Sequence, residues 1–167
     1  MQALKEKIIF NFIEDNRWMY LVDGLKATMI ITVFAVMIGI LLGFLVAVVR
    51  STNEKTGKLK LLNMVCKVYL TVIRGTPVVV QLLIIYFVVF ESVNIDQIIV
   101  ATLAFGFNSG AYVAEIIRSG IMSIDPGQME AGRSLGFNYA QTMWYIIMPQ
   151  AFKVVLPTLC NEFISLL

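Results

Sequence analysis

The chain has 167 residues, of which 59% are hydrophobic and only 14% charged, and its formal net charge is +2. This composition is far more apolar than that of a soluble domain and indicates one integral membrane domain, while the small net charge gives no support for a nucleic-acid partner. The chain contains no histidine, so a catalytic metal or a histidine-based hydrolase site is not expected.

The first twenty residues mix charged side chains with large apolar ones, which predicts an amphipathic helix lying on the membrane over residues 1–20. Trp18 and Tyr20 stand where an interfacial aromatic belt is expected, just ahead of the first span. That span is the charge-free run Ala27–Val49, which covers roughly 34 Å as a helix and is long enough to cross the hydrocarbon core.

The next segment, Arg50–Lys60, carries four basic residues against one acid, which indicates a cytoplasmic loop and places the N-terminus outside. A second crossing is expected over Leu61–Phe90, with a break at Thr76-Pro77, because proline has no amide donor and disfavours helix at the residue before it. Gln81, one turn beyond the break, either faces a translocation path or lies beside an ordinary proline kink, and the sequence leaves both alternatives open.

A third helix is predicted from a cap at Asn94 to about Ile117. Inside it, the stretch Gly106–Gly110 places two small residues four apart around the polar residues Asn108 and Ser109, and the first span repeats this spacing at Gly39 and Gly43. Small residues let helices approach closely, and polar groups at membrane depth need partners or water. This stretch is therefore expected to face the interior of the bundle.

Two acidic residues lie within predicted spans. Glu115 is expected to pair with Arg118, three residues later on the same helix. Glu162 follows Pro149 and a second proline, Pro157, in a fourth span. It lies about 18 Å of helix beyond Pro149, close to mid-membrane, where an ionisable residue indicates a functional site. A helix–helix salt bridge or an interfacial position is the alternative.

Between the third and fourth spans, the polar stretch Asp125–Pro149 predicts a helix-turn-helix elbow outside the bilayer. Its first helix is only about ten residues, roughly 15 Å, and so cannot span the membrane. It is expected to end near Leu135, with Gly136 in the left-handed conformation that glycine adopts cheaply. Two capping patterns begin the helices of the elbow: Asp125 with Pro126 and Gln128, then Asn138 with Gln141.

The elbow also carries a specific resemblance. Glu130-Ala131-Gly132, with Gly136, Ile146 and Met148-Pro149 at the expected spacings, resembles the EAA loop of ABC importer permeases. The family has alanine where Gly132 stands and leucine where Met148 stands. Two further stretches resemble the permeases of polar amino acid importers, of the histidine, glutamine and arginine type: Arg74-Gly75-Thr76-Pro77 with Gln81, and Ala111–Ile116 with Arg118, Gly120 and Ser123.

This resemblance implies an all-α integral membrane protein with a cytoplasmic coupling helix. About four transmembrane helices are expected in this chain, where the family has five. The expected division is an amphipathic segment over residues 1–20 and the importer transmembrane domain over residues 21–167. Because the chain stops at Leu167 within an apolar run, that domain is expected to be truncated at its C-terminal end.

The same resemblance implies a transporter subunit, not an enzyme, in the bacterial cytoplasmic membrane. Its implied partners are a cytoplasmic ABC ATPase dimer, a second permease chain of the same or another sequence, an extracellular or periplasmic amino acid binding protein, and membrane lipid. The ATPase would use ATP and magnesium, whereas this chain would bind no cofactor, and no phosphate-binding glycine loop ending in Gly-Lys-Ser/Thr occurs in it.

Three groups of residues are singled out for these roles. The ATPase-coupling residues are Glu130, Ala131, Gly132 and Gly136. The substrate path is predicted at Gln81, Asn108, Ser109, Asn161 and Glu162, with Glu162 receiving the ammonium group of an amino acid. Structural bends are predicted at Arg74-Gly75-Thr76-Pro77, at Pro149 and at Pro157. Two other functions remain open: a passive channel or ion-coupled carrier subunit, and a structural membrane protein with the elbow as an assembly handle.

Overall fold

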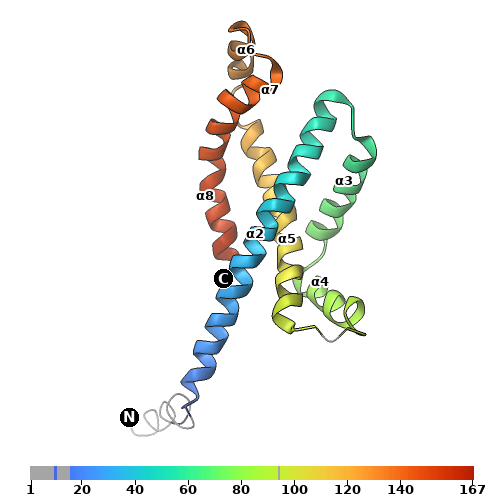
Figure 1. Cartoon of the computed structure of the whole chain (residues 1–167), viewed down its shortest axis with the longest axis vertical. Helices are drawn as coiled ribbons and strands as arrows, with labels where there is room; N and C mark the ends of the chain where they lie inside the picture. The colour runs from blue at the N-terminus through green and yellow to red at the C-terminus, as the bar shows by residue number, and fades with distance from the viewer. Residues whose placement is uncertain (1–9, 11–15, 94) are drawn as a thin grey trace.

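The structure is a computed structural model that describes residue 10 and residues 16–93 and 95–167, of which Lys55 and Thr56 are described in their backbone only. This part of the chain is helical, as the all-α prediction requires (Figure 1). Most of the surface helix expected over residues 1–20 lies outside it. The helical segments are α2 (Trp18–Thr56), α3 (Lys60–Gly75), α4 (Val78–Ile84), the π-helical turn η3 (Ile85–Val89), α5 (Gln97–Met122), α6 (Pro126–Ser134), α7 (Tyr139–Thr142), the π-helical turn η4 (Met143–Ile147) and α8 (Met148–Leu166).

Three helical stretches in the described residues are long and apolar enough to cross a membrane: α2, α5 and the run Tyr139–Leu166. A fourth candidate is the pair formed by α3 and the stretch Val78–Val89, which is bent by 109° at Thr76-Pro77. The predicted break is therefore confirmed. Figure 1 shows the elbow of α6 and α7 at the opposite end of the molecule from the start of α2, as a membrane-crossing arrangement needs.

Several predicted boundaries were wrong. Helix α2 continues past Val49 to Thr56, so the connection to α3 is only three residues long, with Gly57 and Leu59 at positive φ. Helix α5 runs to Met122 instead of ending near Ile117. Its cap is Asp96, not Asn94, which lies outside the described residues. The Asp96 carboxylate accepts a hydrogen bond from the backbone nitrogen of Ile98 at 2.7 Å, and so satisfies a free donor of the first turn.

The core of the fold is a close contact between α2 and α5 at two pairs of glycines. A Cβ atom added at any of these glycines would lie 2.6 to 3.0 Å from a side chain of the facing helix. Such pairs of small residues let membrane helices approach closely enough for extensive van der Waals packing. Each glycine has its own neighbour: Gly39 faces Ser109, Gly43 faces Val113, Gly106 faces Ile38 and Gly110 faces Leu42.

Helix α5 is the centre of the bundle. In the most apolar stretch of α5, 56% of the residues are buried, against 28% in the corresponding stretch of α2 and 17% in that of the span ending with α8. Helix α8 packs on α5 at Gly120, where an added Cβ would overlap the Val155 side chain. The remaining apolar surface of α2 and α8 is exposed, so it is available to lipid or to other chains.

The glycine contact gives a first prediction. Gly43→Ala places a methyl group 2.6 Å from Val113 Cγ1 and 2.8 Å from the Ala114 nitrogen, whereas Gly24 in the same helix has nothing within 4 Å. We expect Gly43→Ala to destabilise the protein by about 1–3 kcal/mol through overpacking, and Gly24→Ala to have no destabilising effect. The midpoint temperature of thermal unfolding in detergent measures both. Equal midpoints would contradict the proposed packing constraint.

Candidate functional site

The depth of each polar residue in the membrane follows from its neighbours on α2. The charge-free run Ala27–Val49 is centred on Ile38, which therefore marks the middle of the hydrocarbon core. A Cβ at Gly39 would lie 2.6 Å from Ser109 Oγ, and a Cβ at Gly106 would lie 2.8 Å from Ile38. The polar pair Asn108 and Ser109 is thus at mid-membrane, and both residues are buried, as predicted.

Helix α8 brings Glu162 to the same level. The Thr32 hydroxyl donates to the backbone oxygen of Leu166 at 2.9 Å, which fixes the end of α8 against α2. Glu162 is one helical turn nearer the elbow than Leu166, so it lies level with about Val36. Its half-buried side chain lies beside the Ser109 hydroxyl. Ser109 Oγ is fully buried and has no hydrogen bond of acceptable geometry within the described residues.

Gln81 holds the break between α3 and α4. Its Nε2 group lies 2.7 Å from the Ile73 carbonyl, 2.9 Å from the Thr76 carbonyl and 2.7 Å from Thr76 Oγ1. The Thr76 hydroxyl donates to the Val72 carbonyl, which leaves its oxygen free to accept from Gln81. The two amide hydrogens of Gln81 thus serve acceptors that the broken helix leaves without backbone donors.

The other end of the same amide joins the break to α5. Gln81 Oε1 accepts a hydrogen bond from Asn108 Nδ2 at 3.1 Å, and both side chains are buried. Four of the five predicted path residues are therefore brought to one level: Gln81, Asn108, Ser109 and Glu162. Asn161 is exposed, and its backbone carbonyl accepts from Ser165.

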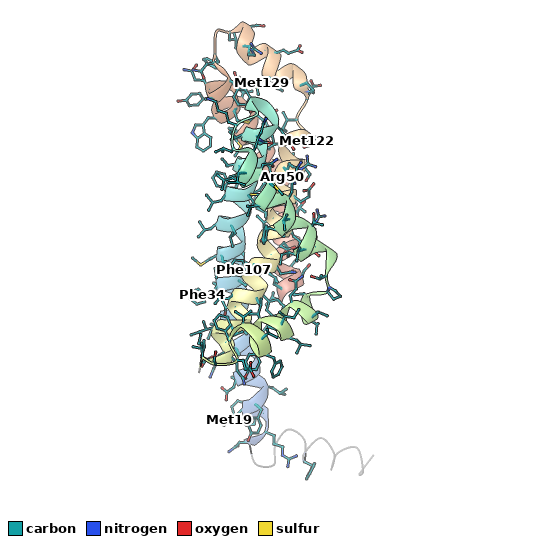
Figure 2. All side chains as sticks on the ribbon, turned by 90° about the vertical axis from the view of Figure 1, so that its right-hand side faces the viewer. Met19, Phe34, Arg50, Phe107, Met122 and Met129 are labelled. Carbon is teal, nitrogen blue, oxygen red and sulfur yellow. The ribbon has the colours of Figure 1, made fainter. Side chains whose placement is uncertain are left out.

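An ionic cluster at the elbow side of this polar layer was only partly foreseen. The predicted pair is confirmed, with Arg118 Nη2 3.0 Å from Glu115 Oε1. The same carboxylate also lies 3.3 Å from Arg50 Nη1 and 3.8 Å from Arg74 Nη1, so it joins α2, α3 and α5. Figure 2 shows Arg50 on the elbow side of Phe107. Sequence spacing reveals partners on one helix but not those from other helices.

The elbow has the predicted form. Asp125 caps α6 by accepting from the Gly127 nitrogen, although Gln128 does not complete the capping pattern and contacts Gln150 instead. At its end, the Gly136 and Phe137 nitrogens donate back to the carbonyls of Arg133 and Gly132, with Gly136 at φ +86°. This pair of backbone hydrogen bonds is a Schellman motif, which requires a residue that tolerates positive φ.

The second half of the elbow begins with a complete capping box. Asn138 accepts from the Gln141 nitrogen, and the Gln141 side chain accepts from the Asn138 nitrogen, each at 2.9 Å. The chain then passes through the wide turn η4 into α8, which begins just before Pro149 and continues past Pro157. The prolines therefore do not interrupt α8, and the irregular backbone lies immediately before the first of them.

Helix α6 has one face exposed and another packed against the second half of the elbow. Glu130 and Ala131 are exposed, whereas Gly132 is buried against Thr142 and Ile146 of the second half of the elbow. Helix α6 packs on α7 and η4. A cavity of about 540 Å³ separates the elbow from the end of α2, and four methionines are among its mostly apolar lining: Met122, Met129, Met143 and Met148. The elbow is thus attached through α5 and η4 rather than packed on α2.

A helical membrane protein with a broken span, a buried polar layer at mid-depth and a capped elbow belongs, as a class, to the membrane permeases. Residues 39–167 match the family described as binding-protein-dependent transport system inner membrane component. The chain belongs to this family, and it is embedded in a membrane.

Individual relatives agree with this assignment. The chain is 38% identical to the L-cystine transport system permease protein TcyB of Bacillus subtilis, over 99% of this chain and 69% of that protein. It is 39% identical to the arginine transport system permease protein ArtQ of Bacillus subtilis, over 88% and 66%. A solved structure described as an amino acid ABC transporter with histidines matches with a TM-score of 0.74 and 42% identity, over 88% and 70%. The chain thus spans about two thirds of the length of these relatives.

Gln81 supplies the second prediction. Gln81→Glu removes both amide hydrogens and leaves the Ile73 and Thr76 carbonyls facing a carboxylate. Because unpaired buried polar groups cost about 1–3 kcal/mol each, we expect a clear loss of stability. Gln97→Glu is the matched control, since Gln97 is exposed and, among the described residues, makes one side-chain hydrogen bond, to Tyr86. The thermal unfolding midpoints of the two variants measure this difference. Equal stability would show that Gln81 does not hold the break.

Gly132 gives the third prediction. The family alanine would place a Cβ 2.4 Å from Thr142 Cγ2 in this chain, so Gly132→Ala is expected to destabilise by about 1–3 kcal/mol. Thr142→Ser removes that methyl group and keeps the hydroxyl that donates to Asn138. We therefore expect the double variant to recover part of the loss. A double-mutant cycle of unfolding free energies measures this coupling, and strict additivity would refute the contact.

Proposed function

We propose that this chain is a permease subunit of an ATP-driven importer that carries polar amino acids across the bacterial cytoplasmic membrane. The observation that carries the proposal is the polar layer at mid-membrane, where Glu162 lies beside Ser109, and Asn108 pairs with Gln81 of the span broken at Pro77. Broken helices that surround a site near the bilayer midplane are a recurring design of transporters. The relatives named for arginine and cystine transport support an amino acid as the substrate.

Within this layer, Glu162 is the proposed receptor for the ammonium group of the substrate. A half-buried carboxylate at mid-membrane is costly unless it meets a positive charge. The buried hydroxyl of Ser109 beside it is available for a further polar contact. Gln81 and Asn108 use their polar atoms on the bend and on each other, so their proposed role is to shape the path. Asn161, which is exposed, is proposed to line the path from the neighbouring turn of α8.

The elbow is the proposed contact with the ATPase. Glu130 and Ala131 are exposed on α6 and are free to dock in a cleft of a partner, with Glu130 as the charged contact. Gly132 and Gly136 act from inside, by fixing the shape of the elbow. Because α6 packs on η4 and η4 continues into α8, a movement of α6 reaches the helix that carries Glu162.

The remaining components follow from this assignment. A cytoplasmic ATPase dimer would consume ATP and magnesium, a second permease chain of the same or another sequence would complete the path, and a binding protein would deliver the amino acid from outside. The N-terminus is proposed to lie outside, which puts the elbow and the basic residues Arg50, Lys58 and Lys60 on the cytoplasmic side, as the positive-inside rule favours.

The test is transport in proteoliposomes that contain the chain with its ATPase, second permease chain and binding protein. We expect uptake of labelled arginine or glutamine only when ATP is present inside. Glu162→Gln should lower the uptake of arginine at least tenfold, or about 1.4 kcal/mol, whereas Glu91→Gln at the exposed outer end should not. Uptake that is indifferent to ATP would favour the passive channel or ion-coupled carrier, and unchanged uptake by Glu162→Gln would remove Glu162 from the site.

A further inference from the structure

Helix α3 presents three different faces. The face that packs on α2 and α5 contains Asn63, Cys66, Leu70 and Ile73. An exposed apolar face lies on the opposite side and includes Leu61, Val65, Val68 and Val72, with the exposed Leu62 and Met64 at its two edges. Lys60, Lys67 and Arg74 recur every seven residues and therefore form a single stripe, the basic stripe, between these two faces. Thr71 is exposed and lies next to it.

The contacts of α3 with α2 fix the depth of this stripe. Asn63 Nδ2 donates to Asn53 Oδ1 at 2.8 Å, and Leu70 shares a buried cluster with Val46. The two helices are antiparallel, so Lys67 is level with Val49, at the inner end of the charge-free run. Arg74 is level with Leu42, about 10 Å deeper. The basic stripe thus leads from the cytoplasmic surface toward the break near mid-membrane.

The charges of the stripe are only partly neutralised. Arg74 reaches Glu115 at 3.8 Å and lies 5.7 Å from the centre of the Tyr112 ring, yet its side chain is 43% exposed. Lys60 and Lys67 are exposed and take part in no ion pair within the residues that the structure describes. Glu115 is shared by three arginines and Glu54 by two of them, so these two acids leave the lysines of the stripe without a neutralising partner among the described residues, and this end of the bundle carries excess positive charge.

Charged side chains inside a membrane face water or a partner, whereas apolar side chains face lipid. We infer that the basic stripe of α3 lines a water-filled inner vestibule and binds the carboxylate group of the amino acid as it passes between the mid-membrane layer and the cytoplasm. Glu162 and the stripe then recognise opposite ends of a zwitterion, and they lie at different depths. The inference takes only the identity of the carboxylate from the proposed function.

The test compares two neighbouring positions at nearly the same depth, about 6–8 Å deeper in the membrane than Val49. Thr71→Cys introduces a thiol beside the stripe, and Val72→Cys introduces one on the apolar face, where Val72 is 53% exposed in this chain. The assembled transporter in lipid nanodiscs is treated with an anionic and a cationic methanethiosulfonate. Peptide mass spectrometry follows each site separately, so Cys66 and Cys160 stay in place. Rates are normalised to those of a free thiol.

We expect Thr71→Cys to react readily, and about tenfold faster with the anionic reagent than with the cationic one. Adding Lys67→Gln should lower this preference roughly threefold. Val72→Cys should react slowly with both reagents, because lipid covers it. Equal reactivity of the two positions, or no preference for the anion, would overturn the inference. Lysines that merely reach lipid headgroups would leave Thr71→Cys as unreactive as Val72→Cys.

The carboxylate is tested by protection. Millimolar glutamine should slow the reaction of Thr71→Cys with the anionic reagent, whereas glutaminamide, which lacks the carboxylate, should not. Equal protection by both, or by neither, would refute the carboxylate site. If the chain were not part of an ATP-driven importer, the result would differ in another way. Uptake in proteoliposomes would be independent of ATP, while the reagent preference and the accessibility of Thr71→Cys would be unchanged.

Discussion

The close approach of α2 and α5 at their glycine pairs is the contact on which the rest of the arrangement depends. In a membrane the hydrophobic effect does not drive helices together, so association needs tight packing and polar contacts. Glycines on both helices provide the packing, with Gly39 and Gly43 facing α5 and Gly106 and Gly110 facing α2. Since Ser109 lies within this contact, the same packing sets the depth and the burial of the candidate site.

A second constraint is the cost of polar groups at that depth. The break at Thr76-Pro77 leaves carbonyl groups of α3 without helical donors, and irregular backbone is tolerated in a membrane only where protein or water satisfies it. Gln81 meets this need and is itself held by Asn108. The bend, the amide pair and α5 therefore form one connected unit. Ser109 and Glu162 face each other in the same layer: the Ser109 hydroxyl is buried and has no hydrogen bond of good geometry within the described residues, and the Glu162 carboxylate lies beside it.

Sequence reasoning predicted the features that depend on local pattern. The charge-free first span, the break before Pro77, the capping box at Asn138 and the left-handed Gly136 all follow from rules within a few residues. Features that depend on other helices were missed or left open. The three arginines around Glu115 come from three helices, and the inward packing of Gly132 depends on Thr142. Asn94 was predicted as the cap of the third helix, whereas Asp96 caps it; both residue types cap well, so residue type alone does not locate the cap.

These polar contacts join α2, α3, the bend and α5 to one another, whereas α8 has fewer of them. Glu115 joins α2, α3 and α5 by ion pairs, and Gln81 ties the bend to the same α5. Helix α8 has fewer polar ties: it packs extensively on α5 around Gly120, is hydrogen-bonded to α2 at Thr32, and begins in the π-helical turn next to the elbow. A π-helical turn is a common irregularity at functional sites. The helix that carries Glu162 is thus the one that continues directly from the elbow, whereas Ser109 lies on α5, which ion pairs and Gln81 tie to the other helices. In the proposed function, a shift of the elbow would change the distance between these two groups, which would couple an ATPase contact on α6 to the layer at mid-membrane.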